Sequence, residues 1–519
     1  MSARPHGAPG LPERKRPRRS RVRRILLYGA TRGLTEGLLA ARGLTLAALL
    51  SPAAFGAWSL FRLAARYATL PGIGALRGLE REISQAAQHP GSDAAPSGLP
   101  GSSLASDLTA RTSLTFTSLV SLAISAVALA VSFAAADADL VLGLRALAAG
   151  MPVEALFLYT LVYVRSRGDL RTYAQLEVLS AAFQLTLCAA LAWLLGLPGA
   201  FAGFVLAHLC VFARSARRLP LRPALSIGRL RRLLRVGVPQ ALTIFLGLAL
   251  VSADKLVVAA YGGMDLLGYY AFAGALAGLA ATLGLVIRVV VFQEVYGEAV
   301  RSGHVPAVRE HLSRTLLPFA WLVPPLVGLA AIAAGPAVQL LLPRYEPALA
   351  AARLFVFTGV TSGLLTLAMI AVVAADRQRG LPGRAALALV ANLSLSALAL
   401  RSGAGLTGVA AAAVASQGAY SASVLLVALR AAHVGRPGLA AARALLPVGW
   451  CVAATAAATA LADGPGLGSA GIALGIYGLL LLPLVPFVPD PVRRLSRRSG
   501  SGDPRPALPG ASPVELDAP

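Results

Sequence analysis

The chain has 519 residues, of which 56% are hydrophobic and only 13% charged, and its net charge is +24. Soluble proteins carry about 25% charged residues, so a soluble protein of this length would lack the polar residues that its surfaces need. A basic charge can indicate nucleic-acid binding, but here the arginines lie at the ends of apolar segments rather than along one face. The composition therefore predicts an all-α polytopic membrane protein.

Fourteen apolar segments follow a Pro/Arg-rich start, and most approach the ~20 residues that a helix needs to cross a bilayer. In chain order, the predicted spans are 25–50, 53–76, 113–135, 140–164, 173–196, 199–214, 236–260, 267–292, 312–334, 347–375, 383–400, 405–429, 444–462 and 468–488.

Polar segments divide these spans into blocks. We predict a disordered basic tail (1–24), an N-lobe of six spans (25–214) with a mobile loop at 80–112, a basic linker (215–235), a C-lobe of six spans (236–429), a helix pair (444–488) and a disordered tail (489–519). Similar sequences open spans one and seven, RILLYG at 24–29 and RLLRVG at 232–237. Because six is even, both halves run in the same sense, which predicts two lobes related by a pseudo-two-fold axis along the membrane normal.

The basic residues set the orientation. With the amino terminus inside, 37 of the 47 Lys and Arg residues fall in inner segments, and the outer loops hold only Arg344 and Arg401. This asymmetry is the positive-inside pattern. It predicts a multi-pass membrane protein with both termini in the cytoplasm.

The eight remaining basic residues lie within the predicted spans. Four of them, Arg145, Lys255, Arg288 and Arg353, are within about two turns of a span end and can reach the interface by snorkelling. The other four, Arg32, Arg42, Arg62 and Arg66, lie deeper on spans one and two. Each would cost roughly 2.5–3.5 kcal/mol facing lipid, so we expect these four to face the protein interior or water.

Acidic residues are too few to neutralise these charges. The spans contain Glu36, Glu154, Glu177 and Asp254, which leaves a surplus of four positive charges. Glu36 can pair with Arg32 one turn away, whereas Arg62 and Arg66 share a helix face that carries no acid. Arginine binds phosphate oxygens bidentately, so this face suits an anionic guest. Pairing of these arginines with Glu154 or Glu177 across helices is the structural alternative.

Several short segments resemble the polysaccharide/oligosaccharide-lipid flippases of the multidrug/oligosaccharidyl-lipid/polysaccharide exporter superfamily. They are LSPAAFG at 50–56, GVPQ at 237–240, ADK at 253–255, LGYY at 267–270, LPRY at 342–345, ADR at 375–377 and GLTGVA at 405–410. The resemblance implies two six-helix lobes in a V, an extra helix pair and alternating access. Lipid II flippases of this superfamily carry cavity arginines on spans one, two and eight, and Arg288 lies on the comparable eighth span here.

The leading hypothesis is a flippase, not an enzyme, that moves a polyprenyl-diphosphate oligosaccharide to the outer leaflet of a bacterial inner membrane for surface polysaccharide biosynthesis. Its expected substrate-binding residues are Arg32, Arg42, Arg62, Arg66 and Arg288. Its candidate ion-coupling residues are Glu36, Glu154 and Asp254. We expect no cofactor and no metal site, and coupling to H⁺, Na⁺ or the membrane potential.

Two rival functions and a set of partners complete the expectations. A cation-coupled multidrug exporter of the same fold would need a cavity of net acidic character. An integral-membrane glycosyltransferase or ligase would want a large outer loop, and the predicted outer loops are short. The partners expected are the lipid-linked substrate, the bilayer and, as candidates, a polysaccharide polymerase or glycosyltransferases.

Overall fold

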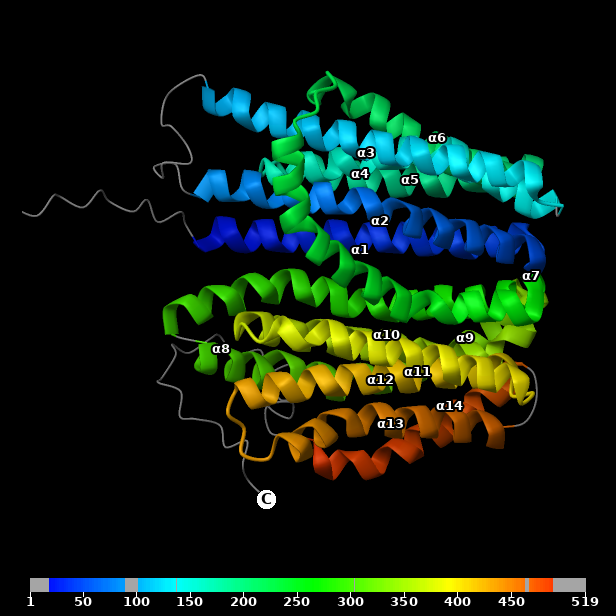
Figure 1. Cartoon of the computed structure of the whole chain (residues 1–519). Coiled ribbons are helices and arrows are strands. Elements are labelled where there is room, and N and C mark those ends of the chain that lie inside the picture. Colours follow the sequence, from blue (N-terminus) through cyan, green and yellow to red (C-terminus); the bar gives the residue numbers. More distant parts are fainter. Residues whose placement is uncertain (1–17, 89–100, 137, 303, 463–465, 489–519) are drawn as a thin grey trace, which may run out of the picture.

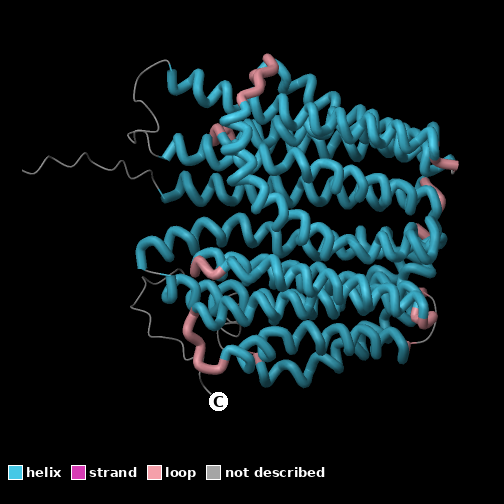
Figure 2. Tube along the Cα trace, in the orientation of Figure 1, coloured by secondary structure: helices cyan, strands magenta, loops and turns pink. Residues whose placement is uncertain are grey.

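The computed structural model describes residues 18–88, 101–136, 138–302, 304–462 and 466–488, and within them the regular structure is entirely helical (Figure 2). The predicted tail 489–519, most of the tail 1–24 and the centre of the loop 80–112 lie outside these residues. The α-helices are α1 (Arg18–Leu49), α2 (Pro52–Gln88), α3 (Gly101–Ala134), α4 (Ala138–Ser166), α5 (Leu170–Leu195), α6 (Leu197–Ser215), α7 (Ile227–Ser302), α8 (His304–His311), α9 (Leu317–Leu341), α10 (Leu349–Ala374), α11 (Leu381–Arg401), α12 (Gly405–Ala431), α13 (Pro437–Leu461) and α14 (Leu467–Leu481).

The helices form two groups with α7 between them (Figure 1). Helices α1 to α6 lie on one side of the second part of α7 and α8 to α14 on the other, with α13 and α14 outermost, and the first part of α7 crosses α1 and α2 in this view. Within the described residues, eleven segments are long and apolar enough to cross a membrane. Helices α1 and α2 are not among them, because Arg32 and Arg42 interrupt the apolar sequence of α1 and Arg62 and Arg66 that of α2. The predicted all-helical membrane architecture is confirmed.

Predicted spans seven and eight are the two helical parts of α7, which meet at a non-helical residue, Gly263. Gly263 has a φ of 74°, a left-handed conformation that glycine adopts without the steric cost of a Cβ atom. The predicted turn between 260 and 267 is therefore made within a single residue or two. The ninth span is likewise composite, since α8, a π-helical turn and α9 follow one another without a loop.

Helices extend into two segments for which we expected loop or linker. Helix α2 continues to Gln88 and α7 begins at Ile227. These extensions pack on each other, with Leu76 and Leu79 of α2 and Leu233 of α7 buried in one apolar cluster. Glu80 adds salt bridges to Arg77 at 2.8 Å and to Arg165 at 2.9 Å. Apolar residues at helical spacing and a salt bridge to α4 thus carry α2 beyond the predicted span.

Helices α2 and α7 join the two halves, and they touch at the start of α2 and again in its second half. A Cβ atom at Gly237 of α7 would overlap the carbonyl oxygen of Gly74, and one at Gly268 would overlap the carbonyl oxygen of Pro52. Small residues allow such close approach of two backbones. Between these two contacts the helices leave room for a cavity.

Candidate anion-binding cavity between the two halves

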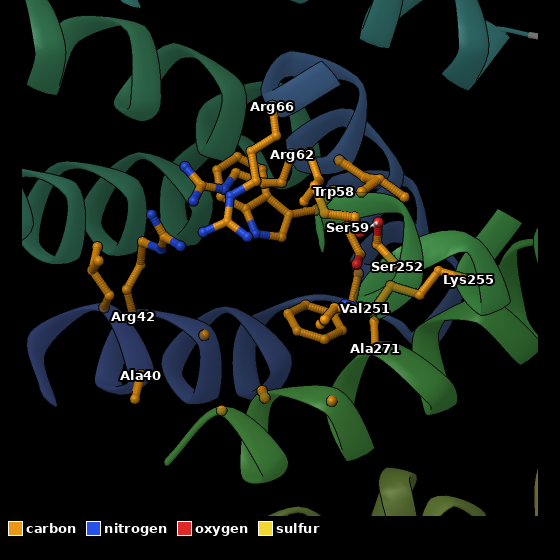
Figure 3. A pocket seen from close by; sticks show the side chains of 18 of the residues that line it. Ala40, Arg42, Trp58, Ser59, Arg62, Arg66, Val251, Ser252, Lys255 and Ala271 are labelled. Carbon is orange, nitrogen blue, oxygen red and sulfur yellow. Dashed lines mark hydrogen bonds between the residues drawn. The ribbon is translucent and has the colours of Figure 1, made fainter. Parts of the chain in front are cut away.

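A cavity of about 290 Å³ lies between α1 and α2 of the first half and α7 (Figure 3). It lies between the two close contacts of α2 with α7. Its walls combine apolar and small residues with a set of charged side chains. The charged residues that line it are Glu36, Arg42, Arg62, Arg66 and Lys255.

Four of these five charged side chains are cationic, and they come from three helices. Figure 3 shows Arg42, Arg62 and Arg66 gathered at one end of the cavity and Lys255 at the other. Arg62 and Arg66 share a face of α2 because residues four apart are neighbours on a helix. Lys255 comes from α7, so the second half of the chain contributes to the same cationic lining.

Aromatic and amide groups, rather than carboxylates, hold the two most enclosed arginines. Arg42 is 7% exposed, donates a hydrogen bond to the side-chain oxygen of Gln184 on α5, and lies 5.7 Å from the ring centre of Trp58. Arg62 lies 4.8 Å from the ring centre of Phe204 on α6. Such cation–π contacts orient a guanidinium group without cancelling its charge.

None of the four cavity cations forms a salt bridge with another described residue. The carboxylate of Glu154 on α4 acts on Arg62 and Arg66 electrostatically from beyond salt-bridge distance. The structural alternative of direct pairing is therefore not realised for Arg62 and Arg66 within the described residues. The cavity keeps a positive surplus, and its chemistry suits an anion.

Arg32 is placed differently from the other predicted substrate-binding arginines. It binds Glu36 at 2.5 Å on its own helix and Glu177 of α5 at 2.7 Å. Tyr173 also donates a hydrogen bond to Glu177, at 2.6 Å. Arg32 does not line the cavity, and it instead joins α1 to α5. Glu36, its partner, does line the cavity.

Of the other three predicted site residues, Asp254 and Glu154 are not among the residues that line the cavity. Arg288 belongs to α7, but its side chain is outside the described part of the structure. Asp254 is fully buried behind Lys255, where it accepts hydrogen bonds from the hydroxyl of Tyr270 and from the backbone N–H of Lys255. Glu154 lies near the arginine end of the cavity without lining it.

Lys255 lines the cavity, whereas its position near the end of span seven led us to expect that its side chain reaches the membrane interface. The available signal was a lysine next to a buried acid in an apolar segment, which is expensive in a membrane and marks a functional position by default. No sequence signal pointed to Trp58 or Gln184 as the groups that orient Arg42.

Comparison with known protein sequences gives one partial match, to a family profile. The profile of the family described as "Polysaccharide biosynthesis protein" matches residues 103–345. Comparison with the curated proteins gives no match.

Solved structures share the fold. A lipid II flippase, MurJ, in an inward closed conformation is 13% identical with a TM-score of 0.64, and the match covers 89% of this chain and 100% of that one. An inward-facing MATE-family multidrug resistance transporter of the MOP superfamily is 16% identical with a TM-score of 0.58, covering 78% and 95%. A MATE transporter in the straight conformation is 16% identical with a TM-score of 0.52, covering 80% and 95%.

At these identities the likeness to the MurJ and MATE structures establishes the fold alone. The family profile matches less than half of the chain. The comparisons therefore show a multi-pass helical fold shared with these structures and a partial match to the family described as "Polysaccharide biosynthesis protein", and the flippase family is what the sequence motifs indicate.

Proposed function

We propose that the protein moves a polyprenyl-diphosphate oligosaccharide across the bacterial inner membrane, from the cytoplasmic to the outer leaflet. The observation that carries this proposal is the cavity that Arg42, Arg62 and Arg66 line at one end and Lys255 at the other, none of them in a salt bridge with a described carboxylate. Arginine forks bind the oxygens of a phosphate bidentately, and a diphosphate offers enough oxygens for several of them.

The size of the cavity fits this assignment of roles. Sites for small ligands typically measure about 300–1,000 Å³, so about 290 Å³ accommodates a diphosphate but no oligosaccharide. The close contacts of α2 with α7 at Pro52 and at Gly74 restrict the space further. The sugars therefore require an opened arrangement of the two halves, as alternating access supplies, while the polyprenyl chain stays in lipid.

Coupling to H⁺, Na⁺ or the membrane potential would drive the cycle. Of the three candidate carboxylates, Glu36 is bound to Arg32 and Asp254 is bound to Tyr270. Glu154 is the one whose charge acts on both Arg62 and Arg66. We infer that Glu154 is the counter-charge that an arriving diphosphate displaces in its interaction with these arginines.

Export in cells tests the proposal. A strain that carries Arg62→Ala and Arg66→Ala should lose most of its surface polysaccharide while the protein remains at its normal level in the membrane. Arg145→Ala is the matched control, because Arg145 is exposed, lies beside the ring of Phe133 and does not line the cavity. Undiminished export by the double variant would refute the site.

Export of cationic drugs is the second candidate, favoured by the shared fold of the MATE transporters. The surplus of positive charge in the cavity opposes it, since a cationic drug would meet four like charges there. Drug susceptibility of a deletion strain separates the two functions: the flippase proposal expects unchanged susceptibility and altered surface polysaccharide.

A further inference from the structure

A second and larger cavity, a groove of about 790 Å³, lies in the first half of the chain. Its walls come from α1, from the first half of α5 and from the end of α6. It shares no lining residue with the cavity between the halves. Helix α1 separates the two, since Thr31 and Leu34 face this groove whereas Glu36 and Arg42 line the cavity.

The wall formed by α5 carries a row of small and medium apolar side chains, with Thr172 and Gln175 beside it. Leu170, Ala174, Val178 and Ala182 recur every four residues and so lie along one side of the helix. The alanines create the depth of the groove, because a larger side chain at either position would fill it. Leu34 and Leu170 are 53% and 47% exposed, so the groove is open to the surroundings of the bundle.

The groove is cationic at one end. Arg171 lies in the first turn of α5 and Arg214 in the last turn of α6, and both are exposed. Neither forms a salt bridge with another described residue. The adjacent acid, Asp169, accepts a hydrogen bond from the backbone N–H of Thr172 as the N-cap of α5. The apolar part of the groove therefore ends at two guanidinium groups, which lie at the ends of two helices.

We propose that this groove binds an anionic phospholipid of the predicted inner leaflet. Its phosphate would lie between Arg171 and Arg214, and one acyl chain would lie along the α5 face and Leu34. Basic pockets between helices on the cytoplasmic side of membrane proteins recognise anionic headgroups in this way. A free phosphate would leave the apolar part of the groove without a function.

Position favours a membrane phospholipid over the lipid carrier of the transported sugar. The two arginines lie at helix ends, the level at which headgroups of the bilayer reside, whereas the cavity arginines lie deep within α1 and α2. Two guanidinium groups also match a single phosphodiester, and the cavity with four cations suits a diphosphate. The proposal is independent of what the protein transports.

Such a lipid would support the packing of α1 on α5. The salt bridge from Arg32 to Glu177 joins these two helices directly beside the groove, next to Thr31 and Leu176. A lipid that fills the groove contacts both helices at once. Its binding should therefore raise the thermal stability of the protein, since a ligand that binds only the folded state stabilises it.

Lipid titration of the purified, delipidated full-length protein tests the proposal by native mass spectrometry. The probes are palmitoyl-oleoyl phosphatidylglycerol and, as a neutral reference, the matching phosphatidylcholine. Each basic residue near an anionic lipid changes affinity roughly five-fold, so Arg171→Gln with Arg214→Gln should weaken the tightest phosphatidylglycerol site roughly thirty-fold. The control, Arg217→Gln with Arg222→Gln, removes the same charge from exposed positions outside the groove and should retain wild-type affinity.

A second variant tests the apolar part without changing charge. Ala182→Trp fills the groove and should also weaken phosphatidylglycerol binding while the protein stays monodisperse. Equal binding by the groove and control variants would overturn the proposal. So would a groove variant that keeps phosphatidylglycerol but loses undecaprenyl phosphate, since that result would assign the groove to the carrier lipid.

Discussion

Glu154 is an acidic side chain near the arginine end of the cavity. It forms no salt bridge with Arg62 or Arg66. Removing its charge leaves the arginines with less competition for a phosphate. One nearby charge typically changes the free energy of binding an anion by on the order of 1 kcal/mol, or about five-fold in affinity.

We therefore predict that Glu154→Gln binds farnesyl diphosphate about five-fold more tightly than the wild-type protein, as measured by isothermal titration calorimetry. The export rate in cells should fall, because tighter binding slows release. Glu177→Gln is the control, since its carboxylate is bound to Arg32 and does not line the cavity. Weaker binding by Glu154→Gln than by this control would contradict the role of Glu154 as a counter-charge.

Asp254 gives a prediction about stability. Its carboxylate is fully buried and accepts a hydrogen bond from Tyr270. A buried acceptor that loses its donor typically costs about 1–3 kcal/mol. Tyr270→Phe should therefore lower the melting temperature, measured by intrinsic fluorescence in detergent. Tyr269→Phe alters the neighbouring ring, which packs on Tyr345, and should change the melting temperature little. Equal effects of the two changes would show that the Asp254 hydrogen bond contributes nothing.

Single residues also show how far sequence reasoning reached into the site. The argument that uncompensated arginines must face the interior led to Arg42, Arg62 and Arg66, which the structure brings to one cavity. The sequence indicated the pairing of Arg32 with Glu36 but not its second partner, Glu177, which is 145 residues away in sequence. Contacts between distant helices depend on packing, which hydropathy and spacing within one helix do not report.

Among the helices, α2 and α7 set the distance between the two halves. Gly237 lies against the backbone of Gly74, where a methyl group has no space. Inserting atoms into a tight contact typically costs about 1–3 kcal/mol. We expect Gly237→Ala to lower the melting temperature and to weaken the closed arrangement of the halves.

The matched control for this prediction is Gly228→Ala on the same helix. Nothing lies within 4 Å of a Cβ atom at Gly228, and alanine is the better helix former. This change should leave stability unchanged or slightly raised in the same unfolding measurement. If Gly237→Ala unfolds at the wild-type temperature, the contact between α2 and α7 is not a determinant of the closed state.

Helix boundaries show which part of the fold lay beyond the sequence argument. Hydropathy located the membrane-crossing parts of the helices, because apolar length is dictated by the bilayer. It did not reveal that α2 continues to Gln88 or that α7 begins at Ile227. Those extensions are stabilised by contacts with each other, through Leu79 and Leu233, and so depend on tertiary structure. The break between spans seven and eight was predicted in place, but the sequence argument did not reduce it to a single non-helical residue, Gly263.

For the whole molecule, the distribution of arginine predicts which ends of the helices face the cytoplasm. Gln378 and Ala404 are exposed residues at opposite ends of α11. In a background with Cys188, Cys210 and Cys451 changed to Ala, Ala404→Cys should react with a membrane-impermeant maleimide in intact spheroplasts. Gln378→Cys should react only after permeabilisation. The reverse pattern would invert the topology and place the tails outside.

The central claim is that the cavity between the halves attracts a phosphorylated guest through Arg62 and Arg66. The most direct test is the affinity of the purified protein for farnesyl diphosphate, with the cation tetraphenylphosphonium as competitor. Hydrogen bonds to charged groups are worth about 1.5–3 kcal/mol each, so Arg62→Gln with Arg66→Gln should weaken diphosphate binding by about 100-fold or more. Tetraphenylphosphonium should not compete. Unchanged diphosphate affinity in the double variant, or displacement of the diphosphate by the cation, would contradict the claim.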